Sequence, residues 1–140
     1  MTNRVINPGR LADTATDYGV AYGVVAGNVL SISGQAPVNR QLGIVGETFA
    51  EQTRVVFDSF TVTLEEAGFT WDDVVKINAF VSVEDGVGEY CGILKEYLNR
   101  CSSKDSVAHT YVVVKALALP GVLIEIDGMA IKPLESGEVR

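Results

Sequence analysis

The sequence predicts a single α+β domain over residues 1–140, in which two amphipathic helices cover one face of a mixed β-sheet. The length of 140 residues suits one domain with its own core. Apolar residues recur at helical spacing in two segments, 47–67 and 87–99. The segments before, between and after them are rich in β-branched and aromatic residues, as strands are.

The first two strands are expected to form a hairpin. Residues 18–26 and 29–34 have strand composition, and Gly27-Asn28 between them can form a tight turn. A loop follows, QAPVNRQLGIVGE, because this segment contains one proline and two glycines within a few residues. A short extra strand near the N-terminus is compatible with this order.

The helix over residues 47–67 is indicated by an apolar stripe and by a signal at each end. Glu47 and Glu51 lie in or near its first turn, where the helix dipole favours negative charge. Gly68 follows the last periodic residue, as is usual at a left-handed helix end. The stripe recurs at steps of three and four: Phe49, Thr53, Val56, Phe60, Leu64 and Ala67.

The next elements are a strand over residues 73–83 and a helix over residues 87–99. In the strand, alternation places Val75, Ile77, Ala79, Val81 and Val83 on one face and Lys76, Asn78 and Ser82 on the other. In the helix, the stripe is formed by Val87, Tyr90, Leu94 and Tyr97 or Leu98.

Strands over residues 107–117 and 121–132 complete the sheet and are joined near Pro120-Gly121. The first of them is apolar on both faces, and so is the run from Leu123 to Ile126. A sheet that is apolar on both faces must bury both. Since the two helices cover one face, the sequence predicts that the other packs on further copies of the chain.

Composition and charge exclude several classes of function. The net charge of −7 argues against nucleic acid as the main partner, because phosphate contacts need a basic surface. No apolar run approaches the roughly 20 residues of a membrane span, and the N-terminus lacks the apolar core of a signal peptide. A cytoplasmic protein without a membrane partner is therefore expected.

Neither a metal nor a cofactor is expected. Cys91 and Cys101 match no zinc spacing, and His109 is the only histidine of the chain. No glycine-rich phosphate loop follows a strand. The two cysteines are expected to be free thiols.

Two polar residues stand out in the last strands. His109 lies at the head of one, and Glu125 interrupts the apolar run of the other. Because Glu125 lies between Ile124 and Ile126, alternation places it on the opposite face from both, the face that also carries Asp127. A solvated sheet face and a functional site both fit this pattern.

Four motifs taken together resemble the Rid family, the YjgF-like reactive-intermediate deaminases. They are ISGQAPV at 32–38, EQT at 51–53, EEAGFTWDDVVKINAFV at 65–81 and LPGVLIEIDGMA at 119–130. The resemblance runs from Tyr18 to Ala130. It implies the chorismate-mutase-like α+β sandwich, a homotrimer, and hydrolysis of small enamines or imines to a keto acid and ammonia. It implies no cofactor or metal, and a site in the cleft between neighbouring subunits.

The resemblance also implies roles for individual residues. Glu125 matches the glutamate that holds and polarises the attacking water. Tyr18 and Ser33, with Gly34, would line the cleft.

Other positions depart from the family pattern. His109 stands where the family has an arginine that binds the substrate carboxylate, and Tyr111 stands where the family often has a cysteine. Cys91 falls on a helix asparagine of the family, or Tyr90 does if the register slips by one. Imidazole lacks the two parallel donors and the permanent charge of a guanidinium.

Three functions remain open from the sequence. The favoured one is a divergent deaminase, in which Glu125 activates water and His109 binds or protonates the substrate. An imine carbon is already electrophilic, so a positioned water and a proton shuttle suffice. In the second, Cys91 and His109 form a thiolate pair for covalent catalysis. The third is a non-enzymatic trimer that binds a small ligand.

Overall fold

The computed structural model describes residues 2–134 and contains one six-stranded sheet in the order β1-β2-β3-β6-β4-β5. Neighbouring strands are antiparallel except for β4 and β5, which are parallel. The strands are β1 (Arg4–Ile6), β2 (Gly23–Ala26), β3 (Val29–Gln35), β4 (Val74–Val81), β5 (Ala108–Val113) and β6 (Ile124–Ile131). The helices are α1 (Ala15–Tyr18), α2 (Phe49–Ala67), a 3-10 turn (Trp71–Asp73) and α3 (Val87–Cys101).

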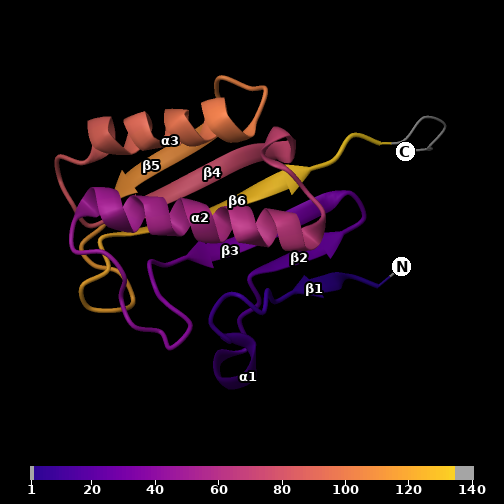
Figure 1. Cartoon of the computed structure of the whole chain (residues 1–140), viewed down its shortest axis with the longest axis horizontal. Coiled ribbons are helices and arrows are strands. Elements are labelled where there is room, and N and C mark those ends of the chain that lie inside the picture. Colours follow the sequence, from indigo (N-terminus) through magenta and orange to yellow (C-terminus); the bar gives the residue numbers. More distant parts are fainter. Residues whose placement is uncertain (1, 135–140) are drawn as a thin grey trace.

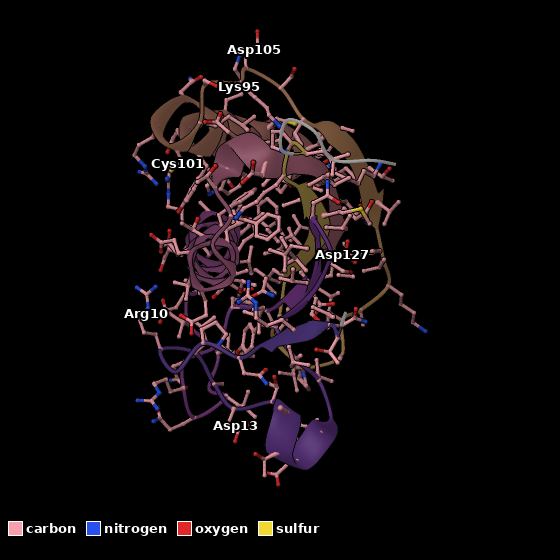
Figure 2. The ribbon with its side chains drawn as sticks, turned by 90° about the vertical axis from the view of Figure 1, so that its right-hand side faces the viewer. Arg10, Asp13, Lys95, Cys101, Asp105 and Asp127 are labelled. Carbon is pink, nitrogen blue, oxygen red and sulfur yellow. The ribbon has the colours of Figure 1, made fainter. Side chains whose placement is uncertain are left out.

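Both long helices lie on one face of the sheet, as the sequence predicts. Figure 1 shows α2 and α3 in front of the strands, and Figure 2 shows the sheet edge-on with Asp127 on the side away from α2. The core lies between the two layers, where Phe57, Phe60, Ile77, Ile124 and Ile126 are fully buried. The predicted α+β architecture is confirmed, including the short N-terminal strand and the β2–β3 hairpin.

The long helix α2 follows its sequence signals closely. All six stripe residues are buried. Thr48 caps the helix, because its Oγ1 accepts a hydrogen bond from the Glu51 N–H at 3.1 Å. Gly68 ends it with φ of 80°. The helix therefore begins at Phe49, two residues later than predicted.

The predicted strand over residues 18–26 is wrong in its first half. Its place is taken by α1 and a loop, and the strand begins at Gly23. The Asp13 carboxylate accepts hydrogen bonds from the N–H groups of Ala15 and Thr16, which favours a helical turn. Gly19, with φ of 70°, ends that turn. Tyr18 therefore lies on a short helix and not on a strand.

Three further details differ from the sequence prediction. A register shift between Val74 and Lys76 buries Val74 and leaves Val75 exposed, because a bulge interrupts the alternation of side chains. Val87 is 52% exposed, and Ile93 joins the buried stripe of α3 in its place. The last two strands are not adjacent, since β4 lies between β5 and β6.

The face of the sheet opposite the helices is uncovered in the single chain. It presents apolar side chains, among them Met129 and Ile131, together with two polar pairs. The Asn78 amide donates to Asp127 at 2.7 Å, and Lys76 Nζ donates to Thr110 Oγ1 at 2.8 Å. Within residues 2–134, no helix combines the length and the apolar character that crossing a bilayer requires.

Candidate functional site

A cavity of about 400 Å³ opens beside the ends of β3 and β6, and it contains three of the residues expected at the site. Tyr18 comes from α1, Gly34 from β3 and Glu125 from β6. Its volume lies within the usual range of ligand pockets. The lining residues are Thr14, Tyr18, Val20, Tyr22, Gly34, Ala36, Val38, Leu42, Leu119 and Glu125.

Glu125 is placed in this cavity by the alternation of β6. Its neighbours Ile124 and Ile126 are fully buried against the helices, so its own side chain lies on the opposite face. The side chain lies directly over Gly34, where a Cβ atom would be only 2.8 Å from Cδ of Glu125. Gly34 therefore allows a close approach that a larger residue would block.

Ser33 supports this arrangement without lining the cavity. Its Oγ donates to the carbonyl oxygen of Ala21 at 2.6 Å, which connects β3 to the loop before β2. The pairing of β3 with β6 is irregular between Ile32 and Gln35, and this irregularity includes Ser33 and Gly34. The hydroxyl of Ser33 thus holds the segment on which the carboxylate of Glu125 rests.

The surroundings of Glu125 favour the neutral, protonated form of its carboxyl group. Burial raises the pKa of its carboxyl group, and the negative charge of Asp127 on the same face raises it further. Among residues 2–134, no side-chain or backbone donor forms a hydrogen bond to the Glu125 carboxylate. Its oxygens are therefore free to hold water, and a glutamate with a raised pKa is suited to proton transfer near neutral pH.

His109 and Tyr111 lie on the other face of the sheet, under α3. They pair with Ile77 and Ala79 of β4, whose side chains point into the core. The oxygen of Tyr90 lies 2.6 Å from His109 Nε2. Burial lowers the pKa of His109, helped by the positive charge of Lys76, and burial raises the pKa of Tyr90. Both shifts favour the uncharged forms of the two side chains, and the tautomer of the imidazole sets which of them donates.

Cys91 is exposed on α3, one residue beyond the contact with His109. Tyr90, and not Cys91, is the helix residue that faces His109. Among residues 2–134, the hydroxyl of Tyr111 has no hydrogen-bond partner although it is buried, and its ring lies edge-on to Tyr90 with the ring centroids 5.3 Å apart. Within one chain, the predicted residues thus form two groups separated by the sheet.

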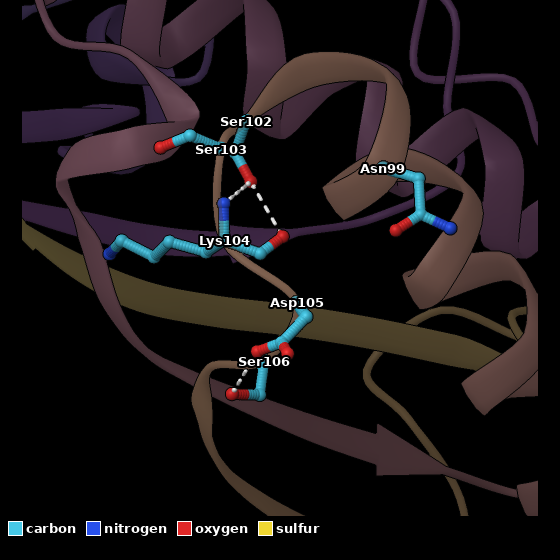
Figure 3. Close-up of a pocket in the computed structure, with 6 residues that line it drawn as sticks. All are labelled: Asn99, Ser102, Ser103, Lys104, Asp105 and Ser106. Carbon is cyan, nitrogen blue, oxygen red and sulfur yellow. Dashed lines mark hydrogen bonds between the residues drawn. The ribbon is translucent and has the colours of Figure 1, made fainter.

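A second cavity, of about 530 Å³, lies after α3 and is shown in Figure 3. Several of its polar groups form hydrogen bonds with one another or with the neighbouring strand β4. Ser102 Oγ accepts from the N–H of Lys104, and Lys104 Nζ donates to the Val74 carbonyl at 2.6 Å. Ser106 Oγ donates to Asp105. These bonds explain the shape of the loop.

The sequence of this chain matches the family profile described as Endoribonuclease L-PSP over residues 11–132. The chain belongs to the Rid (YjgF, L-PSP) family. The family resemblance predicted from the motifs is therefore confirmed.

Relatives of this Rid protein are found in bacteria and archaea. It is 30% identical over 111 residues to the 2-iminobutanoate/2-iminopropanoate deaminase of Escherichia coli, which covers 79% of this chain and 84% of the relative. It is 33% identical over 111 residues to a RutC family protein of Pyrococcus horikoshii, covering 78% and 83%.

Solved structures of the family share the fold. The YjgF gene product of Escherichia coli superimposes with a TM-score of 0.83 at 27% identity, covering 93% of this chain and 99% of that chain. A putative endoribonuclease of Thermotoga maritima gives the same TM-score and identity, covering 95% and 99%. The YjgF-like fold predicted from the sequence is thus confirmed.

The sequence did not predict the apolar residues that line the cavity beside Glu125. Val20, Val38, Leu42 and Leu119 lie in loops or irregular segments, where no periodicity marks a side chain as buried or exposed. Leu119 had one available signal, since it opens the motif LPGVLIEIDGMA, which contains Glu125. Among residues 2–134, no three His, Cys, Asp or Glu side chains gather as a metal site requires.

Proposed function

We propose that this Rid protein is a hydrolytic deaminase that converts an imine or enamine to a carbonyl compound and ammonia. The observation that carries the proposal is Glu125, a carboxyl group with a raised pKa in a cavity of about 400 Å³, without a protein hydrogen-bond donor among residues 2–134. The Escherichia coli relative at 30% identity is a 2-iminobutanoate/2-iminopropanoate deaminase, which supports the same reaction class.

The reaction requires a base for water and an acid for the departing nitrogen. Glu125 takes a proton from a bound water while the oxygen adds to the C=N carbon, and it returns this proton to the nitrogen, which gives a neutral carbinolamine. The carboxylate then takes the proton of the carbinolamine hydroxyl and passes it to the nitrogen as the C–N bond breaks, so that the carbonyl forms and ammonia leaves. Water is consumed and the carboxylate is restored. A raised pKa suits both roles of one carboxyl group. Since the imine carbon is already electrophilic, this series of reaction steps needs no metal or cofactor.

A homotrimer completes the site between subunits. In one chain, Glu125 and His109 lie on opposite faces of the sheet. The edge strand β5 leaves Val112 and Val113 38% and 52% exposed, and the face that carries Glu125 is uncovered. Packing of the β5 edge of one copy against this face of the next buries these side chains. It can then bring the group of Cys91, His109 and Tyr111 to the cavity of Tyr18, Ser33, Gly34 and Glu125.

His109 acts in this arrangement as a neutral group. Burial lowers its pKa, and its Nε2 is occupied by the Tyr90 hydroxyl. It therefore lacks the charge with which an arginine would bind a carboxylate. The bond to Tyr90 also leaves no support for a thiolate pair between Cys91 and His109.

The test is the substitution Glu125→Gln, which keeps the size of the side chain and removes its basicity. An amino-acid oxidase generates the imine in place, and semicarbazide competes for it, so that deaminase activity lowers semicarbazone formation. We expect turnover to fall by on the order of 100-fold or more, as for loss of a general base. Glu66→Gln, at an exposed position of α2, makes the same charge change and should leave turnover intact.

Two results would contradict the proposal. Full turnover by Glu125→Gln would remove the carboxylate from the mechanism. A folded wild-type protein that binds keto acids but consumes no imine would favour the non-enzymatic binding function.

A further inference from the structure

The wall of the Glu125 cavity is apolar and carries no positive charge. None of its ten lining residues is a lysine, arginine or histidine, and five of them are aliphatic: Val20, Ala36, Val38, Leu42 and Leu119. Tyr18, Val20 and Leu119 are 65%, 46% and 41% exposed, which makes the rim a cluster of exposed large hydrophobic residues. Such a cluster around a cavity is typical of a surface that binds an apolar group.

One wall residue has an unusual backbone. Leu42 has φ of 64° and is the only non-glycine residue with positive φ among residues 2–134. This left-handed conformation brings Cβ close to the following carbonyl oxygen and is disfavoured for a leucine. Glycine would adopt it without that conflict, and Gly43 is the next residue in the chain.

The surrounding turn holds Leu42 in this conformation. Asn39 Oδ1 accepts hydrogen bonds from the N–H groups of Gln41 and Gly43, both at 2.9 Å. The Leu42 N–H donates to the Asn39 carbonyl at 3.0 Å, and the Asn39 N–H donates to Gly43. An unfavourable conformation that its neighbours maintain in this way points to a function for the side chain that it places.

Gln52 connects this turn to the rest of the cavity wall. Its side chain is buried, and Nε2 donates to the carbonyls of Gly46 at 3.1 Å and Gly121 at 3.0 Å. Its Oε1 accepts from the N–H of Leu123 at 2.7 Å. One side chain thus joins the end of the loop with Leu42, the turn after Leu119 and the segment that leads to Glu125.

We propose that Leu42 is a specificity-determining residue, which together with Leu119 makes the cavity select imines with a branched aliphatic or aromatic substituent over those with a methyl group. This inference rests on the proposed deaminase function for the chemistry. Gln52 is a positioning residue, because it fixes the two loops relative to Glu125 without lining the cavity.

The test compares two imines that differ only in the substituent. Those made from leucine and alanine both carry the carboxylate, so the ratio of their kcat/KM values reports the apolar wall alone. The leucine side chain has three more carbons, and each apolar carbon that the wall removes from water strengthens binding. Since the wall is partly exposed, we expect a preference of about tenfold for the leucine imine.

Leu42→Gly removes the side chain and the backbone conflict together. We expect it to reduce the preference to within about twofold while the melting temperature stays the same or rises, because glycine tolerates positive φ. Val45→Ala is the matched control, since Val45 is exposed in the same loop and does not line the cavity. It should keep the preference. Gln52→Ala should lower the preference and kcat together.

Binding provides a readout without turnover. We expect 4-methyl-2-oxopentanoate to bind about tenfold more tightly than pyruvate by calorimetry, and Leu42→Gly to abolish the difference. Equal affinities and equal kcat/KM values in the wild type would overturn the inference while leaving the deaminase function intact. Failure to consume either imine would instead overturn the proposed function. A change in the oligomeric mass of Leu42→Gly would show that a neighbouring subunit, and not a substrate, occupies this wall.

Discussion

Replacement of Gly34 by alanine should separate the position of the Glu125 carboxylate from the stability of the fold. The added Cβ would lie 2.8 Å from Glu125 Cδ and 3.0 Å from Oε2. Since non-bonded carbon atoms settle at about 3.5–4.0 Å, the carboxylate must move by roughly 1 Å. It is the end of a flexible side chain beside a cavity, so the loss of unfolding free energy should stay below about 1 kcal/mol, less than for overpacking in a closed core.

The activity should respond far more strongly than the stability. A displacement of about 1 Å in a catalytic group costs on the order of 100-fold in rate. Turnover is measured by competition with semicarbazide, and stability by urea denaturation. Gly9→Ala is the control, because a Cβ there has no neighbour within 4 Å, and it should change neither quantity.

A double-mutant cycle tests the cause. In the Glu125→Gln background, Gly34→Ala should have little further effect on turnover, because the group that it displaces no longer acts as the base. Additive losses would show that Gly34 acts through the backbone or through substrate contact. Unchanged turnover in Gly34→Ala alone would refute the reasoning that the present position of Glu125 matters for the reaction.

Burial and Asp127 raise the pKa of Glu125, so kcat/KM should fall on acidification at a pH above the 4.5 of an ordinary glutamate, and Asp127→Asn should move this limb to lower pH. Between pH 4.5 and the raised pKa, Glu125 binds a proton in the folded chain but not in the unfolded chain. The free energy of unfolding therefore falls as the pH rises through this window. Glu125→Gln should accordingly raise the melting temperature at neutral pH. Tyr90→Phe should lower the free energy of unfolding by about 1–2 kcal/mol in urea, because His109 Nε2 loses its hydrogen-bond partner; an unchanged value would mean that water replaces the hydroxyl. Light scattering should give three times the 15.0 kDa of the chain, and a stable monomer would refute the inter-subunit site.

The local pattern of apolar residues was sufficient to predict which side chains are buried wherever an element packs one face against the core. The stripe from Phe49 to Ala67 marked the buried side of α2, since apolar residues spaced three or four apart lie on the same face of a helix. The same reasoning placed Glu125 opposite Ile124 and Ile126, and the structure puts it in a cavity on that face. The uncovered apolar face of the sheet could also be predicted from the sequence, because two helices cover only one side of a sheet.

Tertiary structure alone decided how distant elements meet. The insertion of β4 between β5 and β6 separates His109 from Glu125, and no local signal specifies which strands become neighbours. Tyr90, and not Cys91, faces His109, because the packing of α3 on the sheet sets the rotation of that helix. The wall formed by Leu42 and Leu119 depends on loops without periodicity, whose shape comes from Asn39 and from the long-range hydrogen bonds of Gln52. Periodicity records which side of an element is buried, whereas the partner across the core is chosen by contacts between residues far apart in the chain.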